Sequence, residues 1–112
     1  MKRGDIFQAR LDPTEGSEQA GSRPVIIVSR DAINDNSPVI IVVPVTDRTH
    51  KTKIYPSHVV LKAGEGKLAK ESVALGEQVR AVSKTRLSNQ IGHLAPHTMA
   101  AINAALKIAI DL

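Results

Sequence analysis

The residues best suited to chemistry gather in one loop, between Asp12 and Pro24, where two glycines accompany Glu15, Glu18 and Arg23. A proline restricts the residue before it to extended backbone, so Arg23 is expected to leave the loop in a fixed direction. A guanidinium matches the geometry of a phosphate bidentately, and a nearby hydroxyl can donate to a non-bridging oxygen. Arginine, hydroxyls and carboxylates on loops therefore indicate chemistry on a phosphate.

The usual signatures of other enzyme classes are missing. The chain has no cysteine, and the spacing of its four histidines does not match a metal pair on a helix or hairpin. It has no phosphate-binding glycine motif and no serine in a nucleophile elbow. We therefore expect neither a metal nor a cofactor. RNA suits such a site, because its 2′-OH is a built-in nucleophile and the protein need only manage protons and stabilise the phosphorane.

Short β-branched runs and one helix must position these groups. The helix is predicted from Pro96, because a proline suits the first turn and apolar residues follow at helical spacing. Between the strands, Arg30–Asn36 is expected to form one helical turn, Pro44 to mark a bulge or an edge, and Thr46–Pro56 to form a long mobile loop. The strands are predicted at Ile6–Leu11, Pro24–Ser29, Val39–Val45, His58–Leu61, Ser72–Leu75, Gln78–Ser83 and Gln90–Leu94.

This pattern predicts a mainly β fold with a C-terminal helix, a small and partly open antiparallel barrel. The 112 residues, 42% of them hydrophobic, fit a single domain over 1–112. Aromatic residues are only 2%, which argues against a platform that stacks nucleic-acid bases, while the net charge of +4 permits a polyanionic partner. No signal peptide and no membrane-spanning run is visible, so we expect a cytoplasmic protein away from membranes.

Four ordered stretches resemble one known family, the MazF/PemK (Kid) toxins of bacterial toxin–antitoxin systems. The resemblance covers nearly the whole chain, and its most specific part is the loop Gly16–Val25. The four stretches are Lys2–Ile6 with Leu11–Thr14, Gly16–Val25, Val43–Thr46, and Ser72–Val82 followed by the terminal helix.

The resemblance implies a small SH3-like barrel, shared with the CcdB gyrase poisons. It implies a metal-independent endoribonuclease, an mRNA interferase that cleaves single-stranded RNA at specific sequences and leaves a 2′,3′-cyclic phosphate and a 5′-OH. It also implies a homodimer. A cognate antitoxin would neutralise the enzyme by laying an acidic, otherwise disordered tail over the RNA groove.

Three residues match catalytic positions of that family. Arg23 matches an arginine that stabilises the phosphorane, and Thr46 a threonine that hydrogen-bonds the scissile phosphate. Glu18 matches a loop glutamate that serves as the base or holds Arg23 in place. The histidine and the second arginine of some family members are replaced here by Ser17 and Leu75, which favours the version of the mechanism that uses Arg23 and Thr46.

A wider set is expected to bind RNA. Glu77 and Gln78 match an acidic–Gln pair on a strand edge, which would read bases or orient the ribose. Lysines and an arginine farther along are expected to contact phosphates. The full set is Ser17, Gln19, Gly21, Lys51, Lys53, Glu77, Gln78 and Arg80.

Two other interpretations remain open at this point. A gyrase-directed inhibitor on the same barrel would be a binding protein, would not need Arg23 and Thr46 together, and would act through the terminal helix. A catalytically silent module that binds nucleic acid or a protein partner is the other, which the low aromatic content and modest charge disfavour.

Overall fold

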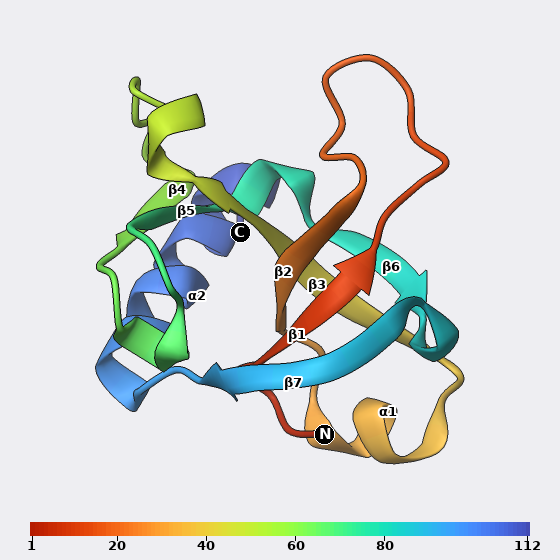
Figure 1. Ribbon diagram of the computed structural model, residues 1–112. Coiled ribbons are helices and arrows are strands. Elements are labelled where there is room, and N and C mark those ends of the chain that lie inside the picture. The colour runs from red at the N-terminus through yellow and green to blue at the C-terminus, as the bar shows by residue number, and fades with distance from the viewer.

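A strongly bent antiparallel sheet organises the chain, and the computed structural model describes all 112 residues (Figure 1). The strands occur in the order β4-β5-β3-β2-β1-β7 across the sheet. Strand β6 pairs with the part of β3 that β5 does not reach. The sheet is barrel-like but not closed, since β4 and β7 are its two ends. The strands are β1 (Asp5–Arg10), β2 (Ser22–Ile27), β3 (Val39–Asp47), β4 (His58–Leu61), β5 (Ser72–Leu75), β6 (Arg80–Ser83) and β7 (Leu87–His93).

Two helices and four short 3-10 turns connect and cover the strands. The longer helix, α2 (Pro96–Ile110), begins with the proline expected at its first turn and has no side-chain cap at Ala95. The shorter helix, α1 (Asp31–Asn36), is the helical turn predicted between β2 and β3. Neither helix combines the length and the apolar character needed to cross a membrane. The 3-10 turns are η1 (Arg48–His50), η2 (Glu65–Lys67), η3 (Gly76–Gln78) and η4 (Lys84–Arg86).

Strand β3 is the pivot of the sheet because it changes partner along one side. It pairs with β6 from Val39 to Val42 and with β5 from Val45 to Asp47, while β2 lies along its other side. Pro44 falls in the interval between β6 and β5 and pairs with Val25 of β2 without a break in register. Of the two alternatives expected at Pro44, the bulge is absent and the edge is found: no strand pairs with Pro44 on the side away from β2, so its missing N–H costs no ladder hydrogen bond.

The hydrophobic core divides into two clusters, as expected for a sheet that bends at β3. One contains ten buried residues, among them Ile6, Ile26 and Val43, and Ile102 of α2 seals it. The other contains seven, mainly from β1, β2, β3 and β6. Both depend on the β-branched runs of β2 and β3, whose side chains fill the two faces of the sheet.

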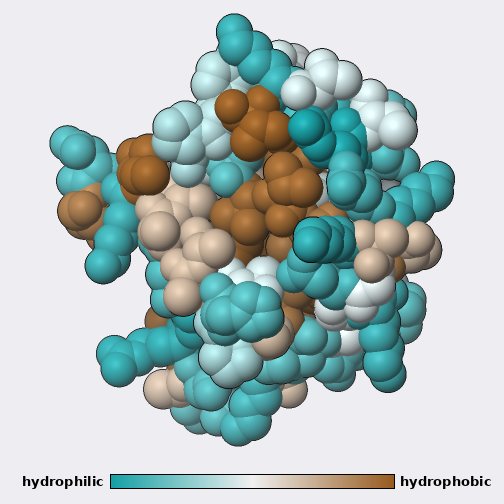
Figure 2. All heavy atoms as spheres, turned by 90° about the vertical axis from the view of Figure 1, so that its left-hand side faces the viewer, coloured by the Kyte–Doolittle hydropathy of each residue, from teal (hydrophilic) through white to brown (hydrophobic).

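An apolar hollow lies on the outside, where β4 meets α2. Val59, Val60 and Ala101 line it, and Lys62, Glu65 and His97 border it. Figure 2 shows apolar side chains gathered at the centre of this face within a polar surround. Val60 is 39% exposed there, so apolar surface on this face remains uncovered in the single chain.

The remaining differences from the sequence prediction lie in the turns and strand ends. The strand predicted at Gln78–Ser83 begins only at Arg80, because Gln78 belongs to η3. The last strand is longer than predicted and begins at Leu87. The predicted loop Thr46–Pro56 is shorter at its start, since Thr46 and Asp47 complete β3 and η1 follows directly.

Candidate active site

Arg23 and Thr46, which are 23 residues apart in sequence, meet at the edge of the sheet. The pairing of β2 with β3 places Val25 opposite Pro44, and extending that register by two residues places Arg23 opposite Thr46. Arg23 Nη1 donates to Thr46 Oγ1 at 3.4 Å, and Arg23 Nε donates to the carbonyl oxygen of Ala20 at 2.9 Å. Thr46 is only 4% exposed. Because its oxygen accepts from Arg23, the hydroxyl hydrogen of Thr46 is free to donate to a ligand.

These two side chains line a cavity of about 220 Å³ at the ends of β2, β3 and β5. Asp47 and Lys70 are the other two ionisable residues in its lining. The remaining lining residues are Ser22, Pro24, Val45, Leu68, Ala69 and Ser72. A guanidinium and a hydroxyl that point into one small cavity can bind two oxygens of a single phosphate.

The loop between β1 and β2 projects beyond the sheet (Figure 1). Side chains from the second half of the chain hold its base. Leu11 N donates to the carbonyl oxygen of Gly21 at 2.8 Å and closes the loop. Gly21 has φ +73°, a conformation that favours glycine at this closure. Arg80 Nη1 donates to the carbonyl oxygen of Leu11 at 3.3 Å, and Arg86 donates to those of Arg10 and Asp12. The base of the loop that carries Arg23 is therefore held in place by these hydrogen bonds.

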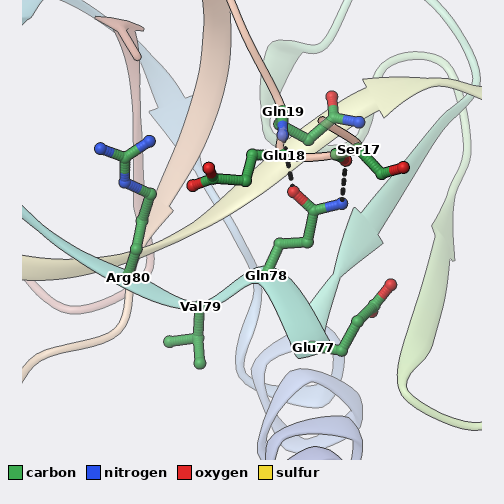
Figure 3. A pocket seen from close by; sticks show the side chains of 7 residues that line it. All are labelled: Ser17, Glu18, Gln19, Glu77, Gln78, Val79 and Arg80. Atoms are coloured by element: carbon green, nitrogen blue, oxygen red, sulfur yellow. Dashed lines mark hydrogen bonds between the residues drawn. The ribbon is translucent and has the colours of Figure 1, made fainter. Parts of the chain in front are cut away.

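A second, larger hollow of about 440 Å³ lies between this loop and η3. Gln78 bridges it: Gln78 Oε1 accepts from Gln19 N at 2.7 Å, and Gln78 Nε2 donates to the carbonyl oxygen of Ser17 at 3.2 Å. Figure 3 shows Gln78 clasping the loop, with Glu77 and Arg80 at opposite ends of the hollow. The hollow is lined by Ser17, Glu18, Gln19, Glu77, Gln78, Val79 and Arg80.

Six of the eight residues expected to bind RNA thus line this hollow or close the loop beside it. Lys51 and Lys53 lie apart, in the connection between η1 and β4, and line neither cavity. Lys51 N donates to the carbonyl oxygen of Arg48, and Lys53 Nζ lies 5.4 Å from the centre of the Tyr55 ring. Glu77 and Gln78 lie on a 3-10 turn, so the expectation of a strand edge is wrong for this pair.

Glu18 lies in the same hollow but does not hold Arg23. Its Oε1 accepts from Glu15 N at 2.9 Å, within its own loop. The hydrogen bonds of Arg23 go to Ala20 and Thr46 instead. Of the two roles that the sequence left open for Glu18, support of Arg23 is therefore not seen in this structure.

Lys70 and Asp47 are the two charged residues of the cavity that sequence reasoning did not select. Lys70 precedes β5, and the pairing of Asp47 with Ser72 brings it beside the end of β3. Only that register could have revealed the contact, because 23 residues separate Asp47 and Lys70 in the sequence. No three His, Cys, Asp or Glu side chains lie close enough together to hold a metal ion.

Glu77 is tied to the fold by a buried histidine. Tyr55 N donates to His58 Nδ1 at 3.1 Å, so Nδ1 is an acceptor and Nε2 carries the proton. His58 Nε2, on a side chain only 1% exposed, then donates to Glu77 Oε2 at 2.9 Å. Partial burial raises the pKa of Glu77, but the hydrogen bond from His58 and smaller interactions outweigh it, and the net pKa is lowered.

This contact predicts an acid-sensitive contribution to stability. Because the folded-state pKa of Glu77 is below its unfolded value, the contribution is present above the unfolded pKa and is lost as pH falls through the folded one. Glu77→Gln should lower the free energy of unfolding near neutral pH by no more than about 1 kcal/mol, since the carboxylate is 40% exposed. Urea denaturation from pH 7 to pH 3 measures it; a difference from wild type that stays constant with pH would contradict the assignment.

Comparison with known proteins gives the family of this fold and site. A family model described as PemK-like, MazF-like toxin of type II toxin–antitoxin system matches residues 2–110. A curated protein of Staphylococcus saprophyticus named Endoribonuclease MazF is 43% identical over 112 residues, which cover all of this chain and 92% of that protein.

Solved structures agree with the fold. A crystal structure of MazF from Deinococcus radiodurans has a TM-score of 0.84 at 25% identity and covers 100% of this chain and 97% of its own. An endoribonuclease from a mycobacterial species, solved in complex with its cognate antitoxin, has a TM-score of 0.82 at 23% identity and covers 100% and 96% of the two chains. The open barrel with its terminal helix is therefore the architecture shared with these proteins.

Proposed function

The chain belongs to the PemK-like, MazF-like toxins of type II toxin–antitoxin systems, and we propose that it is an endoribonuclease that cleaves single-stranded RNA at specific sequences without a metal ion. The observation that carries this proposal is the cavity in which Arg23 Nη1 and Thr46 Oγ1 lie 3.4 Å apart. It supplies a cation and a hydroxyl donor for one phosphate, which is the stabilisation that phosphoryl transfer requires.

The reaction proposed is an internal transfer. The 2′-oxygen of the ribose attacks the adjacent phosphorus as its proton is removed, and the bond to the 5′-oxygen of the next nucleotide breaks. That oxygen takes a proton from water, so that a 2′,3′-cyclic phosphate and a 5′-OH result. Arg23 and the Thr46 hydroxyl stabilise the negative charge on the phosphorane. Glu18 is our candidate for the base that accepts the 2′-OH proton, because its Oε1 is bonded only to Glu15 N and its Oε2 makes no hydrogen bond within the chain.

Sequence selectivity is assigned to the hollow beside the loop. Gln78 and Gln19 bring side-chain amides there, and amides can both donate to and accept from base edges. Gln19 Oε1 is buried and has no hydrogen-bond partner. A buried acceptor without a donor costs about 1–3 kcal/mol, so a base that offers an N–H after a small shift of the loop would be favoured.

The partners proposed are a second copy of this chain and a cognate antitoxin. The apolar face of β4 and α2 is suited to contact with another protein, and the basic side chains around the cavity are suited to an acidic tail that competes with RNA. We place the protein in the cytoplasm, where messenger RNA is available. The assembly is tested by light scattering of the purified chain, alone and with its antitoxin.

The cleavage test uses the purified protein, a long single-stranded RNA and EDTA. We expect discrete cuts at one short sequence, 5′ ends that require phosphorylation before ligation, and no cut where the ribose before the scissile phosphate is 2′-deoxy. Cleavage that requires a divalent ion, or that leaves a 5′-phosphate, would contradict the mechanism. Intact RNA would contradict the function and lead to a DNA-supercoiling assay for a gyrase-directed inhibitor.

A further inference from the structure

Lys70 brings a second positive charge to the cavity that contains Arg23 and Thr46. Its side chain is 76% exposed, and its Nζ lies 3.5 Å from Asp47 Oδ2. Lys70 lines the cavity from the segment before β5, whereas Arg23 enters it from β2. A group bound between them would therefore have a cation on each side.

Asp47 is the ion-pair partner of the Lys70 ammonium group. Asp47 Oδ1 accepts from Thr49 N at 2.9 Å and from Thr49 Oγ1 at 2.8 Å, which leaves Oδ2 toward Lys70. The backbone N–H of Thr49 is the main cause of a lowered pKa at Asp47, so this carboxylate is charged at neutral pH. An ammonium has three N–H donors, and the single contact with Asp47 leaves the others for a ligand.

The position of Lys70 also joins two cavities. A neighbouring hollow of about 420 Å³ is lined by Asp47, Arg48, Thr49, Lys70 and Glu71. Asp47 and Lys70 line both hollows. The other cation there, Arg48, is already engaged, since its Nε lies 3.7 Å from Glu71 Oε1 and its Nη1 donates to the carbonyl oxygen of Lys51. Lys70 is thus the cation at the junction whose donors remain available.

We propose that Lys70 is a further catalytic residue, which contacts the scissile phosphate opposite Arg23, and that Asp47 is its positioning residue. This inference rests on the proposed ribonuclease function. As the phosphorane forms, the added negative charge is shared between the guanidinium of Arg23 and the ammonium of Lys70. Lys70 makes and breaks no covalent bond in this role and keeps its proton, while Asp47 acts only through Lys70.

The test measures single-turnover cleavage of an RNA oligonucleotide that spans the mapped site, with enzyme in saturating excess. Lys70→Ala is expected to lower the rate at saturation about 10- to 100-fold, on the scale of one lost charge-stabilising donor. Lys70→Arg should remain within a few-fold of wild type, because the cation is preserved. Lys107→Ala, which removes the same charge from an exposed site on α2, is the matched control and should match wild type.

Binding supplies a second measurement. For an RNA with 2′-deoxyribose at the cleavage position, the dependence of log affinity on log salt should become shallower by about 0.7 in Lys70→Ala, which corresponds to one phosphate contact to single-stranded RNA. Asp47→Asn should lower the saturated rate by less than Lys70→Ala does, and should add no further loss in the double variant, since its effect passes through Lys70.

The outcomes separate this inference from the function itself. If wild type cleaves and Lys70→Ala cleaves at the same saturated rate, the inference is overturned and the function stands. A change in salt dependence alone, with the saturated rate unchanged, would place Lys70 on a flanking phosphate and also overturn the assignment. If wild type does not cleave the RNA, the proposed function fails and this inference with it.

Discussion

Arg23→Ala is expected to reduce the single-turnover rate of RNA cleavage by about 10³-fold, with little change in stability. Loss of one preorganised donor to a developing charge costs about 10²- to 10³-fold, and Arg23 supplies both a charge and two donors. In the folded chain Arg23 bonds only Ala20 O and Thr46 Oγ1 through its side chain, so few structural contacts are lost. The measurement is the rate at saturating enzyme in EDTA, with circular dichroism to verify the fold.

Two further variants make this prediction specific to the guanidinium. Arg23→Lys preserves the charge but not the planar fork, and should recover only part of the rate. Arg30→Ala removes an exposed arginine beside α1, remote from the cavity, and should cleave as wild type does. Arg23→Ala with more than a tenth of the wild-type rate would exclude Arg23 as the main stabiliser of the phosphorane.

The strands and the helix could be predicted because their local and tertiary preferences agree. The β-branched run of β2 and the second half of that of β3 are buried on both faces, whereas Val39 and Ile41 at the start of β3 are exposed. The apolar residues after Pro96 supply Met99 and Ile102 to the packed face of α2. The resemblance to the toxin family is confirmed by the match over residues 2–110. In these segments a short window of sequence contains most of the information that determines the structure.

The predicted ends of the strands and loops were wrong where a tertiary contact determined the backbone conformation. Gln78 alternates with its neighbours as in a strand, but its amide bonds the loop at Ser17 and Gln19, and the backbone there is a 3-10 turn. The predicted mobile loop loses its first residues to β3, because Thr46 and Asp47 find partners at Val73 and Ser72. Such contacts, 25 or more residues apart in sequence, depend on strand register, which the sequence pattern does not specify here.

The candidate site, too, could be predicted only in part from the local sequence. Motif resemblance could select Arg23 and Thr46 one by one, but their meeting depends on the register between β2 and β3. Lys70 belongs to no motif that we identified, and it reaches the cavity only because β5 pairs with the end of β3. The chemistry of the site is thus visible in the sequence, whereas its second cation is visible only in the fold.

Gly76→Ala is expected to lower both the stability of the fold and the selectivity for RNA, although it leaves every site side chain in place. Gly76 is buried at the start of η3, and its N donates to the carbonyl oxygen of Ser57 at 2.9 Å. A Cβ at this position would lie 2.6 Å from that same oxygen and 3.5 Å from the backbone of Ala105 in α2. Both neighbours are backbone, so the turn itself must move, at a cost of about 1–3 kcal/mol in the free energy of unfolding.

A displacement of η3 should also weaken RNA recognition. Gln78 lies two residues after Gly76, and its side chain bonds the loop that carries Arg23. We expect Gly76→Ala to bind uncleavable RNA more weakly and to discriminate less between its site and single-base variants. Gly92→Ala is the matched control: a Cβ there would lie 2.0 Å from the carbonyl oxygen of Gly66, and neither glycine lines either cavity. Urea denaturation should show a loss of stability in both variants, whereas competition binding should show altered discrimination only in Gly76→Ala. If both variants lose stability but discriminate equally well, η3 does not position the recognition surface, and the clasp between Gln78 and the loop serves the fold alone.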